Sequence, residues 1–411
     1  MLKRISVHQL TTGMFLKEFC GSWMEHPFWR TSFVITEQKD IDSILASSIK
    51  EIWIDSSKGK DVPAGETAVS VAQSDAQVDD ELKAIAQAQR VTGVVSVAVE
   101  IERAARICRR SKQAVVSMFQ EARMGKTVNA EGAQRLVEEI SDSVARNSSA
   151  LISLARLKTA DDYTYMHSVA VCAMMIALAR QLGLDDAQIK LAGMAGLLHD
   201  LGKAAMPMDV LNKPGKLTDA EFTIIKSHPV EGHKMLAAGK IDPIVLDVCL
   251  HHHEKTDGSG YPEGLKDEEI SQFAKMGAVC DVYDAITSNR PYKAGWDPAE
   301  SLRKMAQWAE GHFDHKVFQA FVKSLGIYPI GSLVRLTSGR IGVVVEQTGK
   351  SLTTPRVKVF FSTKSNLRIP PEIIDLSLLD TIDKIAGRED PETWGFHDLN
   401  ELWSGMSSVP W

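Results

Sequence analysis

From residue 161 to residue 325 the sequence follows a helical pattern almost throughout, and this constrains the fold more than any other feature. Apolar residues recur at helical spacing, and the pattern is interrupted at glycines and prolines such as Gly183, Gly202 and Pro229. Alternation of apolar and polar residues does not extend over a useful length, so strands are not expected here. The sequence therefore predicts a helical bundle for this region.

The flanking regions carry other patterns and predict smaller domains. Residues 1–58 combine short alternating segments with one helical stretch, which indicates a small mixed α/β domain. Residues 59–78 are poor in large apolar residues and rich in Ser, Ala, Gly and Asp, as in a flexible linker. Residues 331–411 begin with short alternating segments and glycine turns, which predict a β-hairpin or three-stranded cap before a tail.

Residues 79–145 are predicted to form long helices that lead into the bundle, which itself spans residues 146–330. Asn129 is placed to cap the start of one of these helices. The helices either join the bundle or form a stalk for a homodimer. The bundle is favoured because a heptad pattern is not sustained. The predicted fold is therefore mainly α, with a mixed domain before the bundle and a β cap after it.

Composition indicates a soluble protein of a reducing compartment. The 411 residues are 44% hydrophobic and 24% charged, and the net charge of −6 argues against nucleic-acid binding. The five cysteines are scattered without a CxxC pair, which argues against disulfides and a thiolate zinc site. The N-terminal sequence lacks a signal-peptide core, and the longest apolar run, residues 168–179, is too short to span a bilayer. We expect a cytoplasmic protein without a membrane segment.

The segment 251–265, HHHEKTDGSGYPEGL, places three consecutive histidines before a glycine-rich turn. Neighbouring residues lie ~100° apart around a helix, so one helix cannot aim three successive imidazoles at one point. Two of them can converge, and two converging imidazoles usually indicate a metal. The remaining ligands must then come from elsewhere in the chain.

Other metal-type residues lie in the predicted bundle. His167 shares a helix face with apolar residues such as Val171, although a histidine in this setting is more often part of a core. His199 and Asp200 stand at the end of an apolar helix, where a buried carboxylate is costly unless a cation compensates it. Each of these residues is a stronger candidate metal ligand if further donors lie near it.

The set is completed later in the chain. His228 precedes a proline that can start a helix, and Asp281 shares a helix face with Asp284. Five imidazoles and two inward carboxylates result: His167, His199, Asp200, His228, His252, His253 and Asp281.

Seven donor residues suit two metal ions better than one, because a single zinc needs four ligands at most. Mixed imidazole and carboxylate donors favour iron, manganese or zinc over calcium or magnesium. Two such ions about 3.5–4 Å apart can stabilise both the entering and the leaving oxygen of an attack on phosphorus. Lys203, Arg290 and Lys293 are placed near these donors and can neutralise phosphate oxygens. The residues thus predict hydrolysis of a phosphate ester.

Four motifs in order resemble the HD-GYP family, the phosphodiesterases of the bacterial second messenger cyclic di-GMP. They are HDLGK at 199–203, SHPVEG at 227–232, HHExxDGxGYPxGL at 252–265 and DVYDAITSNRPYK at 281–293. The resemblance covers about residues 145–330. The N-terminal segments TGMFL and SWMEHPFW look like the uncharacterised domain that often precedes HD-GYP in proteobacterial proteins.

The resemblance implies a role for each matching residue. It implies that Asp200 bridges two metals, with His167, His199 and Asp281 on one and His228, His252 and His253 on the other. It implies that Lys203 is the catalytic lysine, that Arg290 and Lys293 contact phosphate, and that Gly260, Tyr261 and Pro262 form the loop at the pocket mouth. His251 is left as a supporting or surface residue, and Glu254 is expected to orient an imidazole.

The expected reaction is hydrolysis of cyclic di-GMP to pGpG, or to GMP after a second cut. Some relatives bind a third metal through a glutamate at the position of Tyr163, so two ions are predicted here, iron or manganese first, with zinc, nickel, cobalt or magnesium open. A catalytically silent receptor and a phosphohydrolase of another nucleotide are the alternatives. GGDEF-type diguanylate cyclases or other signalling proteins are the expected protein partners.

Overall fold

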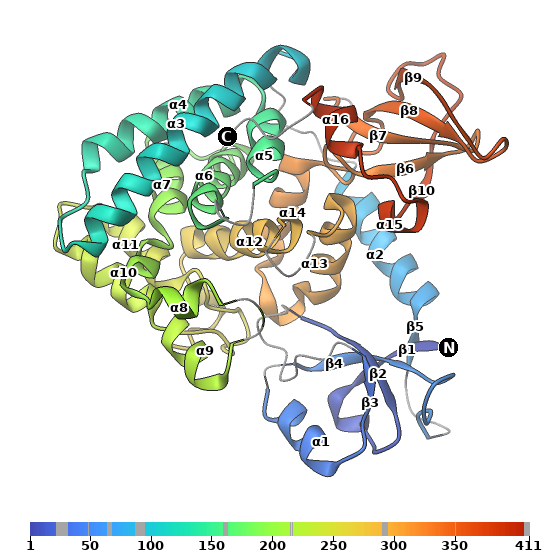
Figure 1. The fold of residues 1–411 in the computed structure, drawn as a ribbon, viewed down its shortest axis with the longest axis horizontal. Helices are drawn as coiled ribbons and strands as arrows, with labels where there is room; N and C mark the ends of the chain where they lie inside the picture. Colours follow the sequence, from blue (N-terminus) through green and yellow to red (C-terminus); the bar gives the residue numbers. More distant parts are fainter. Residues whose placement is uncertain are drawn as a thin grey trace. The chain divides into compact units, whose positions relative to one another are not determined.

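The computed structural model describes residues 1–21, 32–47, 49–63, 68–86, 95–158, 163–213, 215, 217–289, 295–349 and 351–406, apart from the side chain of Tyr163. The chain forms two compact units (Figure 1). One combines Met1–Leu82 with Arg303–Glu310, and the other combines Lys83–Leu302 with Gly311–Trp411.

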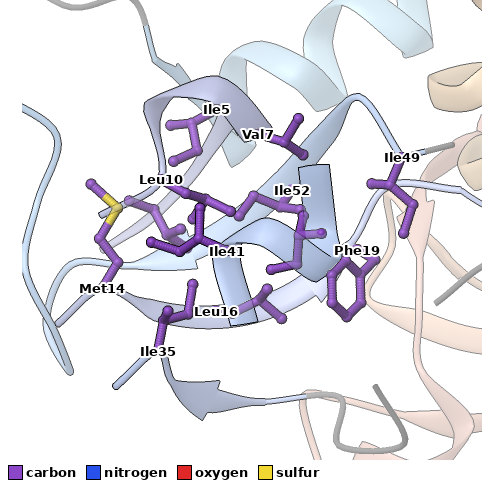
Figure 2. Packing of buried hydrophobic residues seen from close by; sticks show 12 residues of the cluster. Ile5, Val7, Leu10, Met14, Leu16, Phe19, Ile35, Ile41, Ile49 and Ile52 are labelled. Atoms are coloured by element: carbon purple, nitrogen blue, oxygen red, sulfur yellow. The ribbon is translucent and has the colours of Figure 1, made fainter. Parts of the chain in front are cut away.

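The N-terminal unit is built on an antiparallel sheet. Its described strands lie in the order β3-β2-β4-β1-β5. Its elements are β1 (Leu2–Ser6), η1 (Val7–Gln9), β2 (Phe15–Phe19), β3 (Phe33–Val34), α1 (Gln38–Leu45), β4 (Glu51–Asp55) and β5 (Val69–Ser70). Ile5 of β1 lies opposite Ile52 of β4, and Ile41 and Ile44 of α1 close the apolar core with Met14 (Figure 2). The predicted mixed α/β domain is confirmed.

The second half of the segment expected to be a linker carries secondary structure. β5 pairs with β1, and α2 (Val71–Ala86) begins directly after it. Val78 and Leu82 of α2 are buried. The alanines and glutamines that resemble linker composition are also good helix formers, so the composition alone did not reveal the helix.

The larger unit is a helical bundle, which confirms the predicted fold class. Its helices before the β cap are α3 (Val97–Arg123), α4 (Ala130–Arg146), α5 (Ser148–Ala155), α6 (Tyr163–Gln181), α7 (Asp186–Leu198), η3 (Leu201–Ala205), α8 (Met208–Leu211), α9 (Asp219–Ile225), α10 (His228–Ala237), α11 (Pro243–His251), η4 (Asp267–Glu269), α12 (Gln272–Thr287), α13 (Pro298–His312) and α14 (His315–Leu325). Helix α13 contributes its residues 303–310 to the other unit.

Helix α6 occupies the centre of this bundle. It contacts α3, α4, α5, α7, α12 and α14, and its residues 166–179 are all buried. A helix that is apolar on all sides must be covered on all sides. Within the described residues no helix, α6 included, is long and apolar enough to cross a membrane.

The helices that precede α5 belong to the bundle. α3 contacts α5 and α6, and α4 contacts α7. The carboxylate of Glu100 in α3 is buried and accepts hydrogen bonds from Ser143 Oγ at 2.8 Å and from Arg146 Nε and Nη2 at 2.9 and 2.8 Å. These contacts to α4 place both helices in the bundle rather than in a separate stalk.

The β cap is larger than the predicted hairpin or three-stranded sheet. Its described strands lie in the order β10-β6-β7-β8-β9. They are β6 (Leu333–Leu336), β7 (Arg340–Glu346), β8 (Arg356–Ser362), β9 (Leu367–Asp375) and β10 (Ile385–Arg388), followed by α15 (Pro391–Trp394) and α16 (Leu399–Ser404). Pro370 and Pro371 argue against a strand, so the sequence did not predict β9. β9 is an edge strand, where a missing backbone N–H is tolerated.

Replacing Arg146 with methionine tests the buried clamp between α3 and α4. We expect the free energy of unfolding to fall by about 3 kcal/mol, because the buried charge of Glu100 loses its two short hydrogen bonds from a guanidinium and keeps only Ser143 and the exposed Arg103, whose Nη1 lies 3.7 Å away. Urea unfolding measures this loss. The control is Lys190→Met, which removes an exposed pair with Glu138 and should cost less than about 1 kcal/mol. Equal losses in both variants would contradict the account.

Candidate metal centre

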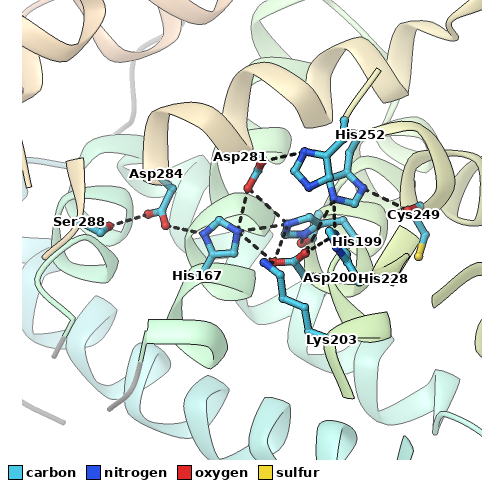
Figure 3. Close-up of polar contacts among 12 residues, drawn as sticks. His167, His199, Asp200, Lys203, His228, Cys249, His252, Asp281, Asp284 and Ser288 are labelled. Atoms are coloured by element: carbon cyan, nitrogen blue, oxygen red, sulfur yellow. Dashed lines mark hydrogen bonds and ion pairs between the residues drawn. The ribbon is translucent and has the colours of Figure 1, made fainter. Parts of the chain in front are cut away.

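Seven histidine and aspartate side chains converge inside the bundle (Figure 3). They are His167 on α6, His199 and Asp200 between α7 and η3, His228 at the start of α10, His252 and His253 after α11, and Asp281 on α12. Six of them are at most 4% exposed, and His253 is partly buried. The structure brings together all seven residues that the sequence predicts as ligands.

Two glycines let the segments that carry these residues approach each other. A Cβ on Gly202 would lie 1.9 Å from the carbonyl oxygen of His228, so η3 and α10 meet through their backbones. A Cβ on Gly196 would lie 2.9 Å from the Cα of Cys172, at the contact between α7 and α6. Only residues without a side chain allow such approaches. The end of α7 is thereby held against both α6 and α10.

His167, His199 and Asp281 form one donor group, whose ligand atoms all lie within 4.8 Å of one another. Nε2 of His167 lies 3.2 Å from Nε2 of His199 and 3.0 Å from Oδ1 of Asp281. Oδ1 of Asp281 lies 3.8 Å from Nε2 of His199. Three donor atoms that face a common point are what a divalent transition-metal ion requires.

The second donor group consists of His228, His252, His253 and Asp200. Nε2 of His228 lies 3.3 Å from Nε2 of His252 and 3.1 Å from Oδ1 of Asp200. The other oxygen of Asp200, Oδ2, lies 3.3 Å from Nε2 of His167 in the first group. Asp200 therefore presents one oxygen to each group.

Backbone carbonyls at helix ends fix the orientation of three of these imidazoles. The Nδ1 atoms of His199, His228 and His252 lie 2.8, 2.7 and 3.1 Å from the carbonyl oxygens of residues 196, 225 and 248. The final turns of α7, α9 and α11 supply these carbonyls, at the ends where helices leave backbone acceptors available, and the carbonyl of Val248 also accepts the backbone N–H of His252 at 3.0 Å. With Nδ1–H donated to a carbonyl, the lone pair of Nε2 points into the site, as in protein metal centres.

Buried carboxylate oxygens indicate that the donor set fits a cation. Within the described residues, Oδ1 of Asp200 and Oδ2 of Asp281 are buried and accept no hydrogen bond. An unsatisfied buried carboxylate oxygen is costly. A divalent cation satisfies such oxygens and the imidazole lone pairs together. The site therefore has the chemistry of a metal centre.

The electrostatics of the site keep two histidines of the second donor group uncharged, as metal binding requires. Burial and the neighbouring His253 hold the pKa of His252 well below its ordinary value, and burial lowers the pKa of His253 to about 3. Both imidazoles are therefore uncharged at neutral pH. Burial also opposes charge on His167, but the hydrogen bonds that it makes to carboxylates raise its pKa to about 10. The carboxylate-rich side of the site attracts positive charge.

Lys203 lies at the edge of the centre, where the sequence predicts a catalytic lysine. Its Nζ donates to Oδ2 of Asp200, and its side chain is 20% exposed. Burial alone would raise the pKa of Asp200, but the Lys203 ammonium together with His199 and His167 outweighs it and holds that pKa well below the ordinary value. Asp200 therefore stays ionised.

The glycine-rich loop is anchored by Glu254, which corrects one expectation from the sequence. Among the described residues, the Glu254 carboxylate binds backbone N–H groups and not an imidazole. Its carboxylate accepts hydrogen bonds from the backbone N–H groups of residues 263, 264 and 265, at 2.7, 3.1 and 3.0 Å. Gly260 packs on the backbone of residues 253–255, and the Tyr261 ring stacks on His253 at 4.7 Å. The Tyr261–Pro262 peptide bond is cis. The loop is thus tied directly to a predicted ligand.

His251 is a supporting residue. Its Nδ1 lies 2.8 Å from Oδ1 of Asp247, one helical turn earlier, and its Nε2 lies 3.4 Å from Oε2 of Glu263. It therefore points to the loop rather than to the donor groups.

Asp284 is a functional residue whose role was not assigned from the sequence. Its Oδ2 lies 2.6 Å from Nδ1 of His167, so it orients this imidazole as backbone carbonyls orient those of His199, His228 and His252. The signal in the sequence is its position one turn after Asp281, on the same helix face. The predicted phosphate contacts Arg290 and Lys293 lie outside the described residues, as does the side chain of Tyr163.

Comparisons with known families and proteins agree with this site. Residues 138–317 match the HD domain family, and residues 2–133 match a domain of unknown function, DUF3391. Cyclic di-GMP phosphodiesterase PA4108 of Pseudomonas aeruginosa is 55% identical over 409 residues, 99% of this chain and 97% of that protein. The cyclic di-GMP phosphodiesterase response regulator RpfG of Xanthomonas campestris is 36% identical over 46% of this chain and 51% of that protein. The 3′3′-cGAMP-specific phosphodiesterase 1 of Vibrio cholerae is 34% identical over 39% of this chain and 38% of that protein.

The bundle and its donor set define an HD-type phosphohydrolase, a class whose members depend on metal ions. Similarity over nearly the full length of the chain then identifies the family within this class. This chain belongs to the HD-GYP family of cyclic di-GMP phosphodiesterases.

Substituting Glu254 with glutamine tests its role as the loop anchor. An amide offers one acceptor oxygen in place of two, so we expect the backbone amides of residues 263–265 to exchange hydrogen roughly 10-fold faster or more. Hydrogen-exchange mass spectrometry measures this directly. Glu269→Gln is the matched control, because Glu269 accepts from the backbone of Lys266 in an exposed turn. Unchanged exchange at 263–265 in Glu254→Gln would show that the loop is held by other contacts.

Proposed function

We propose that this protein hydrolyses a 3′–5′ phosphodiester bond of cyclic di-GMP with two divalent metal ions. The observation that carries the proposal is the pair of donor groups on either side of Asp200. Identity of 55% over nearly the full length to a cyclic di-GMP phosphodiesterase supports the substrate. The first product would be pGpG, and a second cut would give GMP.

The donor groups suggest how the ions would be held. His167, His199 and Asp281 would bind one ion, and His228, His252 and His253 the other, with Asp200 between them. Ions bound there supply an activated water and neutralise charge on the phosphate. Imidazole and carboxylate donors suit iron or manganese, with zinc, nickel, cobalt and magnesium as alternatives. A phenol of pKa near ~10 at position 163 supports two ions rather than three.

Lys203 is the proposed catalytic residue beside the ions. Its ammonium contacts the buried carboxylate of Asp200 and is partly exposed, so it can also reach a bound phosphate. An ammonium in this position can stabilise a phosphate oxygen and donate a proton to the leaving 3′ oxygen. Asp200 would keep this lysine oriented and hold the two ions together.

The loop of Gly260, Tyr261 and Pro262 is proposed to shape the substrate pocket. The Tyr261 ring stacks on His253, and Lys226 Nζ lies 5.1 Å from the centre of that ring. A ring fixed in this way offers a flat surface for a nucleobase. Arg290 and Lys293 are proposed to bind phosphate oxygens, on the evidence of the sequence motif alone.

The cellular setting forms part of the proposal. The five cysteines are free, and four of them are buried, which fits a reducing compartment such as the cytoplasm. GGDEF-type diguanylate cyclases, other signalling proteins and a homodimer stay predictions.

Removing a donor from each side of the centre tests the enzyme against the silent receptor. We expect wild type to convert cyclic di-GMP in Mn²⁺ or Fe²⁺ and the double variant His199→Ala/Asp200→Ala to leave it intact, because both groups lose ligands. Anaerobic incubation followed by chromatography identifies the products. The exposed His315→Ala serves as control and should keep full activity.

The same assay separates the substrates. Preferential cleavage of 3′3′-cGAMP would replace the proposed substrate with that of the relatives specific for it. If wild type cuts neither dinucleotide with any of the metals, the enzyme hypothesis fails.

Replacing Lys203 with methionine tests its catalytic role. We expect kcat to fall roughly 10²–10³-fold at saturating metal, because one cationic group that stabilises the transition state is lost. The metal content should stay that of wild type. Lys234→Met is the control, since Lys234 is an exposed lysine paired with Glu231 on α10. A kcat within the range of this control would remove Lys203 from the mechanism.

A further inference from the structure

A fully buried lysine lies directly behind the metal centre. Lys158 follows α5, and its side chain is 0% exposed. Its Nζ donates to Oδ2 of Asp284, a carboxylate that is itself buried. An apolar pair of similar volume often stabilises a fold as well as a buried ion pair does, so folding stability alone does not explain this pair.

The oxygen that contacts Lys158 is the one that orients His167. Oδ2 of Asp284 lies 2.6 Å from Nδ1 of His167, and Ser288 Oγ donates to the other oxygen at 3.4 Å. The far side of the imidazole then points to the centre, with Nε2 3.0 Å from Oδ1 of Asp281. Lys158, Asp284 and His167 thus form one chain from the bundle interior to the metal ligands.

His167 needs such a chain because of where it lies. His199, His228 and His252 follow or end helices and use carbonyls of the last turn as partners for Nδ1, and the carbonyl of Val248 is shared with the backbone N–H of His252. His167 lies inside α6, where the carbonyls of the preceding turn are occupied by helical hydrogen bonds. Its orientation therefore depends on a side-chain acceptor.

We infer that Lys158 is a positioning residue, which holds the Asp284 carboxylate on His167 and so maintains one of the two metal sites. This inference rests on the proposed binuclear centre and deepens it. Without the ammonium, the buried carboxylate loses its closest cation and turns toward its remaining partners, such as Ser288, and His167 loses its fixed orientation. In the other site, His228 and His252 keep their backbone partners. Lys158 therefore acts selectively on the site of His167, His199 and Asp281.

Metal titration of full-length protein distinguishes this role from a general contribution to folding. Wild type and Lys158→Met are freed of metal and titrated anaerobically with Co²⁺, with calorimetry and the visible absorption of bound cobalt as readouts. We expect one of the two binding steps to weaken about 10–100-fold in the variant and the other to stay unchanged. Lys158→Arg, which keeps the charge, should recover part of the loss. Equal weakening of both steps, or of neither, would overturn the inference.

A double variant that lacks both buried charges keeps the inference testable if Lys158→Met does not fold. The double variant Lys158→Met/Asp284→Asn removes both buried charges and should fold, while the weaker amide acceptor leaves the selective loss in place. Two wild-type binding steps in this variant would show that the pair serves folding alone. Wild type that binds no Co²⁺ would overturn the proposed metal centre, and this inference with it. That outcome is distinct from a wild type with two steps and a variant with the same two.

Discussion

The centre of this protein depends on one buried carboxylate, that of Asp200, which faces two groups of histidines with one oxygen each. Its side chain is 1% exposed, and Oδ1 accepts no hydrogen bond from the described residues. Burying such a charge is unfavourable unless cations surround it. Lys203 provides one, and the donor groups on either side provide places for two more. The close backbone contact at Gly202 brings these groups to the same carboxylate.

Helix ends in the bundle fix the orientation of three candidate ligands. A helix leaves its last carbonyls without partners, and a histidine just beyond the end can donate Nδ1–H to one of them. His199 and His228 are held in this way, and His252 shares the carbonyl of residue 248 with its own backbone N–H. The chemistry of the site is thus an outcome of where α7, α9 and α11 stop. His167 is the exception and takes a carboxylate partner from α12.

The sequence predicted which seven residues come together, because most of them lie in short motifs that can be recognised locally. It could not predict contacts that only the tertiary fold creates. Lys158 and Asp284 are 126 positions apart, and no local pattern joins them. For Glu254 the pattern shows a carboxylate beside imidazoles, but only the folded loop shows that it binds backbone amides. Strand β9, which contains two prolines, and the alanine-rich start of α2 could not be predicted from the sequence. Prolines argue against a strand, and small and polar residues argue for a linker.

The central claim is that two ions share Asp200, and the most direct measurement is the metal content of the anaerobically purified full-length protein. Elemental analysis after dialysis against metal-free buffer counts the ions that stay bound. The account predicts two ions per chain in wild type and a loss of both when Asp200 is replaced by alanine. One ion per chain, or three, would contradict it.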